Sequence, residues 1–361
     1  MRTAPTTIQS LTVARLDVPL LAPFGISGGV QDVARNLLVT IELADGTRGT
    51  GEAAPFPAFN GETQAGAEAA IETMRSWLEG ADVRAWRAIA HALRTSNGMT
   101  GSARCAVETA VLDALTRQAG IPLYAFFGGA ASALETDMTI GTGGVEEALI
   151  AARAILARGI TTIKVKIGAG DLQHDLARLV AIHGAAPESP LILDGNGGMQ
   201  AEAALALLAA LRERNIFPAL LEQPVAGGDW AGMRTLAQRG GVPLAADETA
   251  SSAAHVLRLA AEEAAQVVNI KLMKTGVVEA LDMAAICRAA GLQLMIGSLV
   301  ETVLGTSMSV HFAAGQGGFV HVDLDMPMFM AKNPFEGGFI QRGARLDVSH
   351  VTAGHGVVPR G

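Results

Sequence analysis

The chain has 361 residues, of which 50% are hydrophobic and 17% are charged. A chain of this length and composition can bury a large core, and we expect more than one domain. The formal net charge is −8, and lysine and arginine do not cluster into a basic stretch. We therefore expect a small-molecule partner and no nucleic-acid surface.

The sequence gives no sign of export or of a membrane anchor. Residues 1–25 lack a basic start followed by an unbroken apolar segment, which argues against a signal peptide. No run approaches the roughly 18 to 20 apolar residues that a membrane-spanning helix needs. Cys105 and Cys287 lie in helical patterns rich in small apolar residues, where we expect buried free thiols. These features predict a cytoplasmic protein.

Residues 1–130 are expected to form an α+β domain. Residues 11–20 and 36–55 have the pattern of a small antiparallel sheet, with Asp45-Gly46 at a turn. Apolar residues then recur three and four positions apart, which predicts amphipathic helices. These helices are expected within residues 62–80, 81–94 and 102–120.

Residues 131–325 repeat a different unit, which consists of a strand, a glycine-rich turn and an Ala/Leu-rich helix. Strands that alternate with helices predict a parallel sheet with right-handed crossovers, and eight such units can close into a barrel. The eight candidate strands are TDMTIG, TIKVKI, LILDGN, ALLEQP, PLAADE, VVNIKL, LQLMIG and VHVDLD. Residues 326–361 show no clear helix and are expected to pack back on the first domain. The predicted fold class is α/β, a (β/α)8-type (modified TIM) barrel with an N-terminal α+β capping domain.

Three carboxylates stand at the ends of consecutive predicted strands. Asp194 and Glu222 are 28 positions apart, and Asp247 follows 25 positions later, which is the length of one strand, one loop and one helix. The carboxyl ends of parallel strands meet at one rim of a barrel, so these groups are expected to converge. Oxygen ligands without His or Cys suit a hard divalent cation, and we predict Mg²⁺. Asn196 and Glu248 lie beside these ligands and are expected to support them or to replace one.

Lysines flank the predicted metal site. Strand side chains alternate between faces, so Lys164 and Lys166 are both expected to point into the barrel. Two ammonium groups that close together lower the lysine pKa, as a general base requires. Lys271 is on the sixth strand, opposite Lys166 across a ring of eight. A metal-bound carboxylate between them would present its α-carbon to a base on either side, and inversion through a stabilised enediolate is the predicted outcome.

A pair of acidic residues marks the last predicted strand. Asp323 and Asp325 alternate with Val322 and Leu324, so both carboxylates are expected to point inward. They are predicted to be too far around the ring to join the metal ligands. A paired acidic clamp suits a cationic substrate group such as an α-ammonium.

These motifs together resemble a known family. They are Lys164-Val165-Lys166, Leu193-Asp194 with Asn196, Leu221-Glu222-Gln223-Pro224, Asp247-Glu248-Thr249, Ile270-Lys271 and Asp323-Leu324-Asp325. The set resembles the enolase superfamily, specifically the dipeptide epimerases of its muconate lactonizing enzyme subgroup, which include L-Ala-D/L-Glu epimerase-like enzymes. The resemblance covers essentially the whole chain.

The resemblance implies an isomerase that needs Mg²⁺ and inverts the α-carbon of the C-terminal residue of an L-Ala-L-Xaa-type dipeptide by two-base 1,1-proton transfer. It implies Lys166 and Lys271 as the acid/base catalysts and Lys164 as a contact to the substrate carboxylate. A homo-oligomer is expected. The remaining implied roles are Mg²⁺ ligation by Asp194, Glu222 and Asp247, and substrate contacts from Thr139, Ser298, Glu301, Asp323 and Asp325.

Other functions use the same scaffold. A cycloisomerase, an o-succinylbenzoate synthase or an N-acylamino acid racemase would keep both lysines and the metal, but would have no obvious use for Asp323 and Asp325. A non-catalytic binding barrel is a further alternative. The substrate side chain is a separate question, because residues 24–29 offer no basic group that could pair with a glutamate. A small or apolar second residue is therefore at least as well supported as an acidic one.

Overall fold

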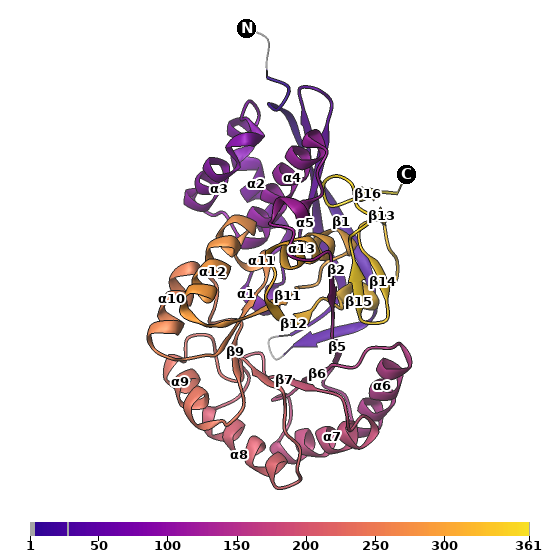
Figure 1. Cartoon of the computed structure of the whole chain (residues 1–361), viewed down its shortest axis with the longest axis vertical. Helices are drawn as coiled ribbons and strands as arrows, with labels where there is room; N and C mark the ends of the chain where they lie inside the picture. Colours follow the sequence, from indigo (N-terminus) through magenta and orange to yellow (C-terminus); the bar gives the residue numbers. More distant parts are fainter. Residues whose placement is uncertain (1–3, 27–28, 361) are drawn as a thin grey trace.

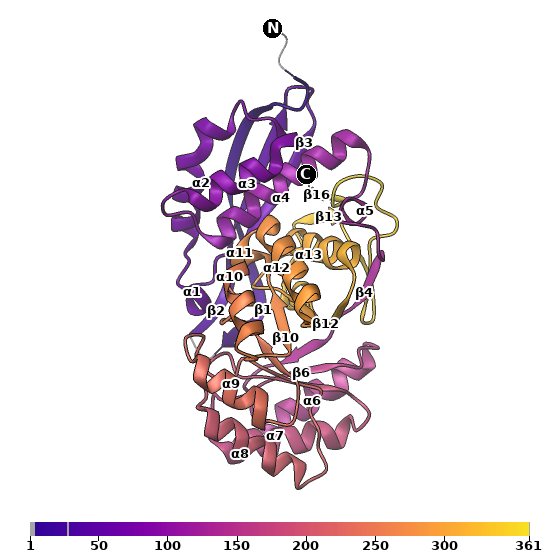
Figure 2. The same ribbon diagram turned by 60° about the vertical axis from the view of Figure 1, so that its left-hand side comes forward.

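The computed structural model describes residues 4–26 and 29–360. An antiparallel sheet with its helices forms one end of the molecule, and a ring of parallel strands wrapped by helices forms the other (Figures 1 and 2). None of the helices in the described ranges is long and apolar enough to cross a membrane.

The N-terminal part is the predicted antiparallel sheet with helices. Strand β1 (Ile8–Ile26) pairs with β2 (Gly29–Leu43), and β2 pairs with β3 (Arg48–Ala53). The expected turn is present, since Gly46 has φ +87° and the Leu43 N–H donates to the Thr47 carbonyl at 2.8 Å. The helical elements are α1 (Pro57–Asn60), α2 (Gln64–Leu78), η1 (Val83–Ala85), α3 (Trp86–Thr95), α4 (Gly101–Ala119) and α5 (Leu123–Phe126).

The predicted barrel is confirmed, and each of its strands overlaps one of the eight candidates. The eight strands pair in parallel in chain order, from first to last. The ring closes because the Asp137 N–H, just before the first strand, donates to the Val322 carbonyl on the last at 2.9 Å. The strands are β5 (Met138–Ile140), β6 (Ile163–Lys166), β7 (Leu191–Asp194), β8 (Leu220–Glu222), β9 (Leu244–Ala246), β10 (Val267–Ile270), β11 (Gln293–Gly297) and β12 (Phe319–Asp323).

Helices surround this ring (Figure 1). Outward-facing strand residues such as Val165 and Leu193 belong to the large core that lies between strands and helices. The helices are α6 (Val145–Ala157), α7 (Leu172–Ala185), α8 (Ala201–Arg212), α9 (Trp230–Arg239), α10 (Ala253–Ala261), α11 (Leu272–Thr275), α12 (Val277–Ala290) and α13 (Val303–Gln316).

The interior of the barrel has an apolar floor below its polar rim. Side chains two positions apart on a strand share a face, so Asp194, Glu222 and Asp247 each lie on the same face as an apolar residue two positions earlier. These apolar residues pack with others as one buried cluster: Ile192, Leu220, Ala245, Val267 and Met295. The charged groups are therefore held at the carboxyl ends of the strands, with apolar packing on the other side.

Glu52 on β3 ties the N-terminal sheet to the barrel. Its buried carboxylate accepts hydrogen bonds from the backbone N–H groups of Thr302 and Gly305, at 2.9 and 2.8 Å, where α13 begins. The Thr302 hydroxyl and the Asn36 amide donate to it as well, both at 2.6 Å. A carboxylate is favoured at a helix N-terminus, where backbone N–H groups are unpaired. This anchor holds the loop that follows β3, so that Phe56 reaches the mouth of the barrel.

The C-terminal segment contacts both parts of the molecule. The Asp113 carboxylate on α4 accepts the His355 N–H at 3.0 Å, and the Arg117 guanidinium donates to the Val357 carbonyl at 2.8 Å. Strand β15 (Arg345–Asp347) also pairs with β4 (Ala133–Glu135), which precedes the barrel. The segment contains η2 (Met326–Phe329), β13 (Phe335–Gly337), β14 (Ile340–Arg342), β15 (Arg345–Asp347) and β16 (Val357–Pro359).

Candidate active site

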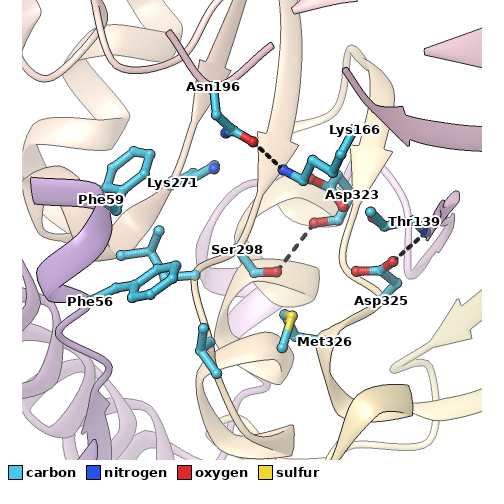
Figure 3. A pocket seen from close by; sticks show the side chains of 12 residues that line it. Phe56, Phe59, Thr139, Lys166, Asn196, Lys271, Ser298, Asp323, Asp325 and Met326 are labelled. Carbon is cyan, nitrogen blue, oxygen red and sulfur yellow. Dashed lines mark hydrogen bonds between the residues drawn. The ribbon is translucent and has the colours of Figure 1, made fainter. Parts of the chain in front are cut away.

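A cavity of about 30 Å³ lies at the carboxyl ends of the barrel strands (Figure 3). Apolar side chains from α1 and its flanking loop cover it on one side, and charged side chains from the strands line the other. The predicted residues that line it are Thr139, Lys166, Asn196, Lys271, Ser298, Asp323 and Asp325. The remaining lining residues are Phe56, Phe59, Leu299, Val300 and Met326.

The other predicted site residues do not line this cavity. Glu248 is partly exposed, whereas the rest are buried. Glu301 is fully buried, and its Oε1 accepts the Leu299 N–H at 2.9 Å. The buried residues are Lys164, Asp194, Glu222, Asp247 and Glu301.

Asp194 is shared by two lysines on the neighbouring strand. Its Oδ2 lies 2.7 Å from the Lys166 Nζ and 2.9 Å from the Lys164 Nζ, and its Oδ1 accepts the Asn196 N–H at 3.0 Å. Asn196 Oδ1 accepts a second hydrogen bond from Lys166 at 2.7 Å (Figure 3). The glycine between them is needed because a Cβ at Gly195 would lie 2.6 Å from the backbone of Pro224. The loop after β7 therefore packs closely against the loop after β8.

The Glu222 and Asp247 carboxylates have similar contacts. In each, one oxygen accepts a side-chain hydrogen bond and the other oxygen lies close to a lysine ammonium group. Glu222 Oε1 accepts a hydrogen bond from the Asn269 amide at 2.7 Å, and its Oε2 lies 2.8 Å from the Lys164 Nζ. Asp247 Oδ1 accepts a hydrogen bond from Lys274 at 2.7 Å, and its Oδ2 lies 2.8 Å from the Lys271 Nζ.

The donor set fits a divalent metal ion. Within the described ranges, Glu222 Oε2, Asp247 Oδ2 and Glu248 Oε2 are buried oxygens that accept no hydrogen bond of good geometry. Buried carboxylate oxygens with unused acceptor capacity are suitable ligands for Mg²⁺, which prefers oxygen. Lysine ammonium groups lie between the carboxylates in this structure. Asp194, Glu222 and Asp247 remain the ligands that we propose.

A second acidic group adjoins the site. Asp137, Asp323 and Asp325 offer oxygens that all lie within 4.8 Å of one another, and no other such group of three occurs among the described residues. Asp137 was not predicted from the sequence. Its carboxylate is buried, and neither oxygen has a hydrogen-bond donor among the residues described. Burial, together with the nearby charges of Asp323 and Asp325, holds the pKa of Asp137 well above its usual range.

The two acidic residues of the last strand both point inward, as predicted. Asp323 Oδ2 lies 2.6 Å from the Lys164 Nζ, and Asp325 Oδ2 accepts the Thr139 N–H at 2.7 Å (Figure 3). The Ser298 hydroxyl donates to the Asp323 backbone carbonyl at 3.3 Å. Burial and the Asp323 charge raise the pKa of Asp325 to about 7. Because Lys164 also contacts Asp194 and Glu222, it bridges the acidic pair and the proposed metal ligands.

The lysine pKa values correct one expectation. Two lysines on one strand predict a lowered pKa, and burial acts in that direction on Lys164. However, the carboxylates of Asp194, Asp323 and Glu222 outweigh burial and hold the pKa of Lys164 well above its usual value. Lys271 shows the same balance, since Asp247 raises its pKa against burial. The acidic neighbours, rather than the second lysine, dominate the electrostatics.

The pKa values of the carboxylates at the site shift in opposite directions. Burial raises the pKa of Asp194, but Lys164 and Lys166 outweigh it and hold that pKa well below its usual range. Lys271 and Lys274 similarly lower the pKa of Asp247 to about 2, against the effect of burial. Burial and the nearby Asp247 charge raise the pKa of Glu248 to about 8.

Sequence reasoning missed several polar groups that hold the site. Gln223 Oε1 accepts the backbone N–H groups of Asp247 and Thr249, at 2.9 and 3.1 Å. Asn269 is two positions before Lys271 on the same strand face, a signal that could have identified it. Lys274 follows Lys271 by one helical turn.

Lysine is concentrated at this site. The chain contains five lysines, and four of them are buried here, whereas Lys332 is exposed. The four buried lysines are Lys164, Lys166, Lys271 and Lys274.

Comparison with known families agrees with this architecture. Residues 9–128 match the N-terminal domain of mandelate racemase / muconate lactonizing enzyme, and residues 147–360 match the family described as enolase C-terminal domain-like. The chain belongs to the mandelate racemase/muconate lactonizing enzyme family. The resemblance that the sequence motifs indicated is thereby confirmed.

Several members of the mandelate racemase/muconate lactonizing enzyme family are similar over nearly their whole length. The aromatic dipeptide epimerase of Herpetosiphon aurantiacus is 54% identical over 353 residues, which are 98% of this chain and 99% of the relative. The crystal structure of a mandelate racemase/muconate lactonizing enzyme from Roseiflexus sp. has a TM-score of 0.95 at 60% identity and covers 100% of both chains. A dipeptide epimerase from Enterococcus faecalis V583, complexed with Mg and the dipeptide L-Leu-L-Tyr, has a TM-score of 0.93 at 30% identity and covers 97% of this chain and 99% of that one.

Proposed function

We propose that this protein is a Mg²⁺-dependent dipeptide epimerase, an isomerase that inverts the α-carbon of the C-terminal residue of an L-Ala-L-Xaa-type dipeptide. One observation carries the proposal: lysines from strands four positions apart in the ring, Lys166 and Lys271, line the same cavity as Asp323 and Asp325. The relative from Herpetosiphon aurantiacus, named an aromatic dipeptide epimerase, supports the reaction, and the Mg and L-Leu-L-Tyr complex of the Enterococcus faecalis enzyme supports the metal and the substrate class.

The metal and the lysines have different roles in the proposed reaction. Asp194, Glu222 and Asp247 would hold Mg²⁺, which stabilises negative charge on a substrate carboxylate when bound. Lys166 and Lys271 stand on opposite sides of the α-carbon. The lysine that is neutral accepts the α-proton at its Nζ, and the protonated lysine on the other side returns a proton to the opposite face. The product is the inverted epimer.

Other groups orient the substrate and exclude water. Asp323 and Asp325 receive the α-ammonium, and Phe56 and Phe59 close the cavity on the side of the N-terminal part. The Lys271 Nζ lies 4.9 Å from the centre of the Phe59 ring, a favourable cation–π distance that helps to fix this lysine. The family resemblance assigns Lys164 to the substrate carboxylate, although in this structure its Nζ contacts Asp194, Glu222 and Asp323 and it does not line the cavity.

The acidic pair separates this function from its closest rivals. Cycloisomerase, o-succinylbenzoate synthase and N-acylamino acid racemase substrates carry no free ammonium, so they would offer no positive group to the two inward carboxylates. A non-catalytic barrel would gain nothing from four buried lysines among carboxylates, since buried charges are costly. The Asp323 and Asp325 pair therefore favours the dipeptide.

Removal of the substrate ammonium tests this clamp. N-acetylation of the dipeptide is expected to lower kcat/KM of the wild type about 10- to 100-fold, because each charged hydrogen bond contributes about 1.5–3 kcal/mol. In the Asp325→Asn variant, kcat/KM for the free dipeptide should fall toward that for the N-acetylated dipeptide. The ratio of the two kcat/KM values therefore decreases. Steady-state kinetics with both substrates measures the ratio, and calorimetric titration of Mg²⁺ into the variant is the control. An unchanged ratio would remove Asp325 from ammonium binding.

The side chain of the inverted residue should be apolar. Besides its catalytic lysines, the cavity wall in the described structure offers apolar groups such as Phe56, Leu299 and Val300. No residue from 24 to 29 is basic, and Ser27 and Gly28 in that stretch lie outside the described residues. A glutamate side chain would therefore be buried without a counter-charge.

This environment predicts a measurable preference. L-Ala-L-Phe should be epimerised with a kcat/KM at least ~100-fold above that of L-Ala-L-Glu, because an unpaired buried charge costs several kcal/mol. L-Ala-L-Gln is the matched control for size, since it carries no charge. A higher kcat/KM for L-Ala-L-Glu than for L-Ala-L-Gln would contradict the apolar assignment.

We also propose a cytoplasmic homo-oligomer without affinity for nucleic acid. Both cysteines, Cys105 and Cys287, are buried free thiols, as expected for a reducing compartment. Leu21 and Val30 on the β1–β2 pair are apolar and 66% and 71% exposed, which supports an interface with another copy. Light scattering after size-exclusion chromatography measures the assembly.

A further inference from the structure

Lys274 is a buried lysine that has no place in the proton-transfer steps. It belongs to α11, is 7% exposed, and does not line the cavity. Its Nζ donates to Asp247 Oδ1 at 2.7 Å, to the Asp247 carbonyl at 2.6 Å and to the Asn269 carbonyl at 2.9 Å. An ammonium group has three donors, so all of them are used. Lys274 therefore holds one fixed position behind Asp247.

Its bonds decide which oxygen of Asp247 faces the site. Oδ1 is tied to Lys274, whereas Oδ2, which faces Lys271, accepts no hydrogen bond of good geometry within the described ranges. Asn269 does the same for Glu222, because its amide occupies Oε1 and leaves Oε2 without such a bond. Lys274 and Asn269 are joined by the hydrogen bond from the Lys274 Nζ to the Asn269 backbone carbonyl. Together they orient the Asp247 and Glu222 carboxylates so that each offers a single oxygen to the proposed metal site.

The backbone that carries Lys274 is itself fixed. Its N–H donates to the Lys271 carbonyl at 2.9 Å, which places the two lysines on one turn. The first residue of α4 packs directly on this turn, since a Cβ at Gly101 would overlap the Lys274 carbonyl. The N-terminal part of the chain therefore packs against α11, and the backbone of Lys274 cannot move without disturbing that contact.

We propose that Lys274 is a positioning residue for the metal site, which raises the affinity for Mg²⁺ by holding Asp247 with Oδ2 toward the ion. This inference rests on the proposed function, because it takes Asp247 as a metal ligand. Groups that orient metal ligands from behind typically contribute about 10- to 100-fold to affinity. Simple repulsion between the ammonium and Mg²⁺ would have the opposite sign, so that removal of the lysine would strengthen binding.

Calorimetric titration of MgCl₂ into metal-stripped protein tests the proposal. Lys274→Met, which keeps the apolar stem and removes the donors, should raise the Kd for Mg²⁺ about 10- to 100-fold. Lys274→Arg, which restores a cationic donor to Asp247, should recover part of this loss. Lys332→Met is the matched control, because that lysine is exposed, and it should leave the Kd unchanged.

The outcomes separate the two claims. If the wild type itself fails to bind Mg²⁺, the proposed function fails and this inference falls with it. If the wild type binds and Lys274→Met binds equally well or more tightly, only the positioning role is refuted. Should Lys274→Met fail to fold, as judged by circular dichroism, Asn269→Ser keeps the backbone carbonyl that Lys274 binds but removes the amide donor from Glu222 Oε1, and it must weaken Mg²⁺ binding if orienting a carboxylate from behind sets the affinity. Unchanged binding in that variant would overturn the proposal.

Discussion

Lys166→Ala and Lys271→Ala are each expected to abolish epimerisation, with kcat lowered by about 10²- to 10⁴-fold, the usual contribution of a general acid or base. Either lysine alone can reach one face of the α-carbon, but inversion needs a proton donor on the other face. Both ammonium groups line the cavity, whereas Lys164 and Lys274 do not. Loss of one lysine should therefore lower the rate of inversion by this large factor rather than halve it.

The two variants should differ in what they retain. In D₂O, each is expected to exchange the α-proton of only one epimer, because the remaining lysine faces only one side. The epimer that exchanges with Lys166→Ala should be the one that does not exchange with Lys271→Ala. Proton NMR of both epimers measures the exchange, and Lys332→Ala is the control at an exposed lysine. Epimerisation at the wild-type rate in either variant would refute the two-base mechanism.

Removal of Glu222 as a ligand is expected to have the second large effect. Glu222→Gln should weaken Mg²⁺ binding at least ~100-fold, since it removes a charged ligand from a fully buried position. Activity should vanish with EDTA in the wild type and return on addition of Mg²⁺.

The adjacent acidic group supplies the matched control. Asp137, Asp323 and Asp325 offer oxygens that all lie within 4.8 Å of one another, so they are the alternative location for an ion. Asp137→Asn keeps the size of this buried side chain and removes none of the proposed ligands, so it should change the Mg²⁺ affinity far less than Glu222→Gln does. Calorimetric titration measures both variants. Loss of Mg²⁺ binding in Asp137→Asn, together with normal Mg²⁺ binding in Glu222→Gln, would assign the metal site to the acidic group on the last strand instead.

The fold could be predicted because short apolar runs alternate with helical patterns, and most of these runs end at or just before a charged residue, as at Lys166, Asp194 and Glu222. The alternation of strand side chains also gave the correct face for Lys164, Lys166 and Asp323, since that period is fixed by backbone geometry. The convergence of Asp194 and Glu222 follows from parallel pairing, in which these two residues are direct partners.

Other features of the site depend on distances that a pattern cannot give. Asp323 was predicted to lie too far around the ring to join the metal ligands, but the pattern does not show that Lys164 is long enough to contact Asp323, Asp194 and Glu222 at once. The same contacts reverse the expected direction of the Lys164 pKa. Lys274 lies beyond the end of its strand, where helical geometry replaces the two-residue period. These are packing effects between strands distant in the chain, and they require coordinates.

The most direct test of the central claim is α-proton exchange in D₂O with Mg²⁺, measured by mass spectrometry and by separation of epimers across a library of L-Ala-L-Xaa dipeptides. We predict one deuterium at the α-carbon of the C-terminal residue, together with the inverted epimer, and the highest rates for apolar side chains. Absence of exchange from every dipeptide in the presence of Mg²⁺ would contradict the assignment and favour the cycloisomerase or N-acylamino acid alternatives.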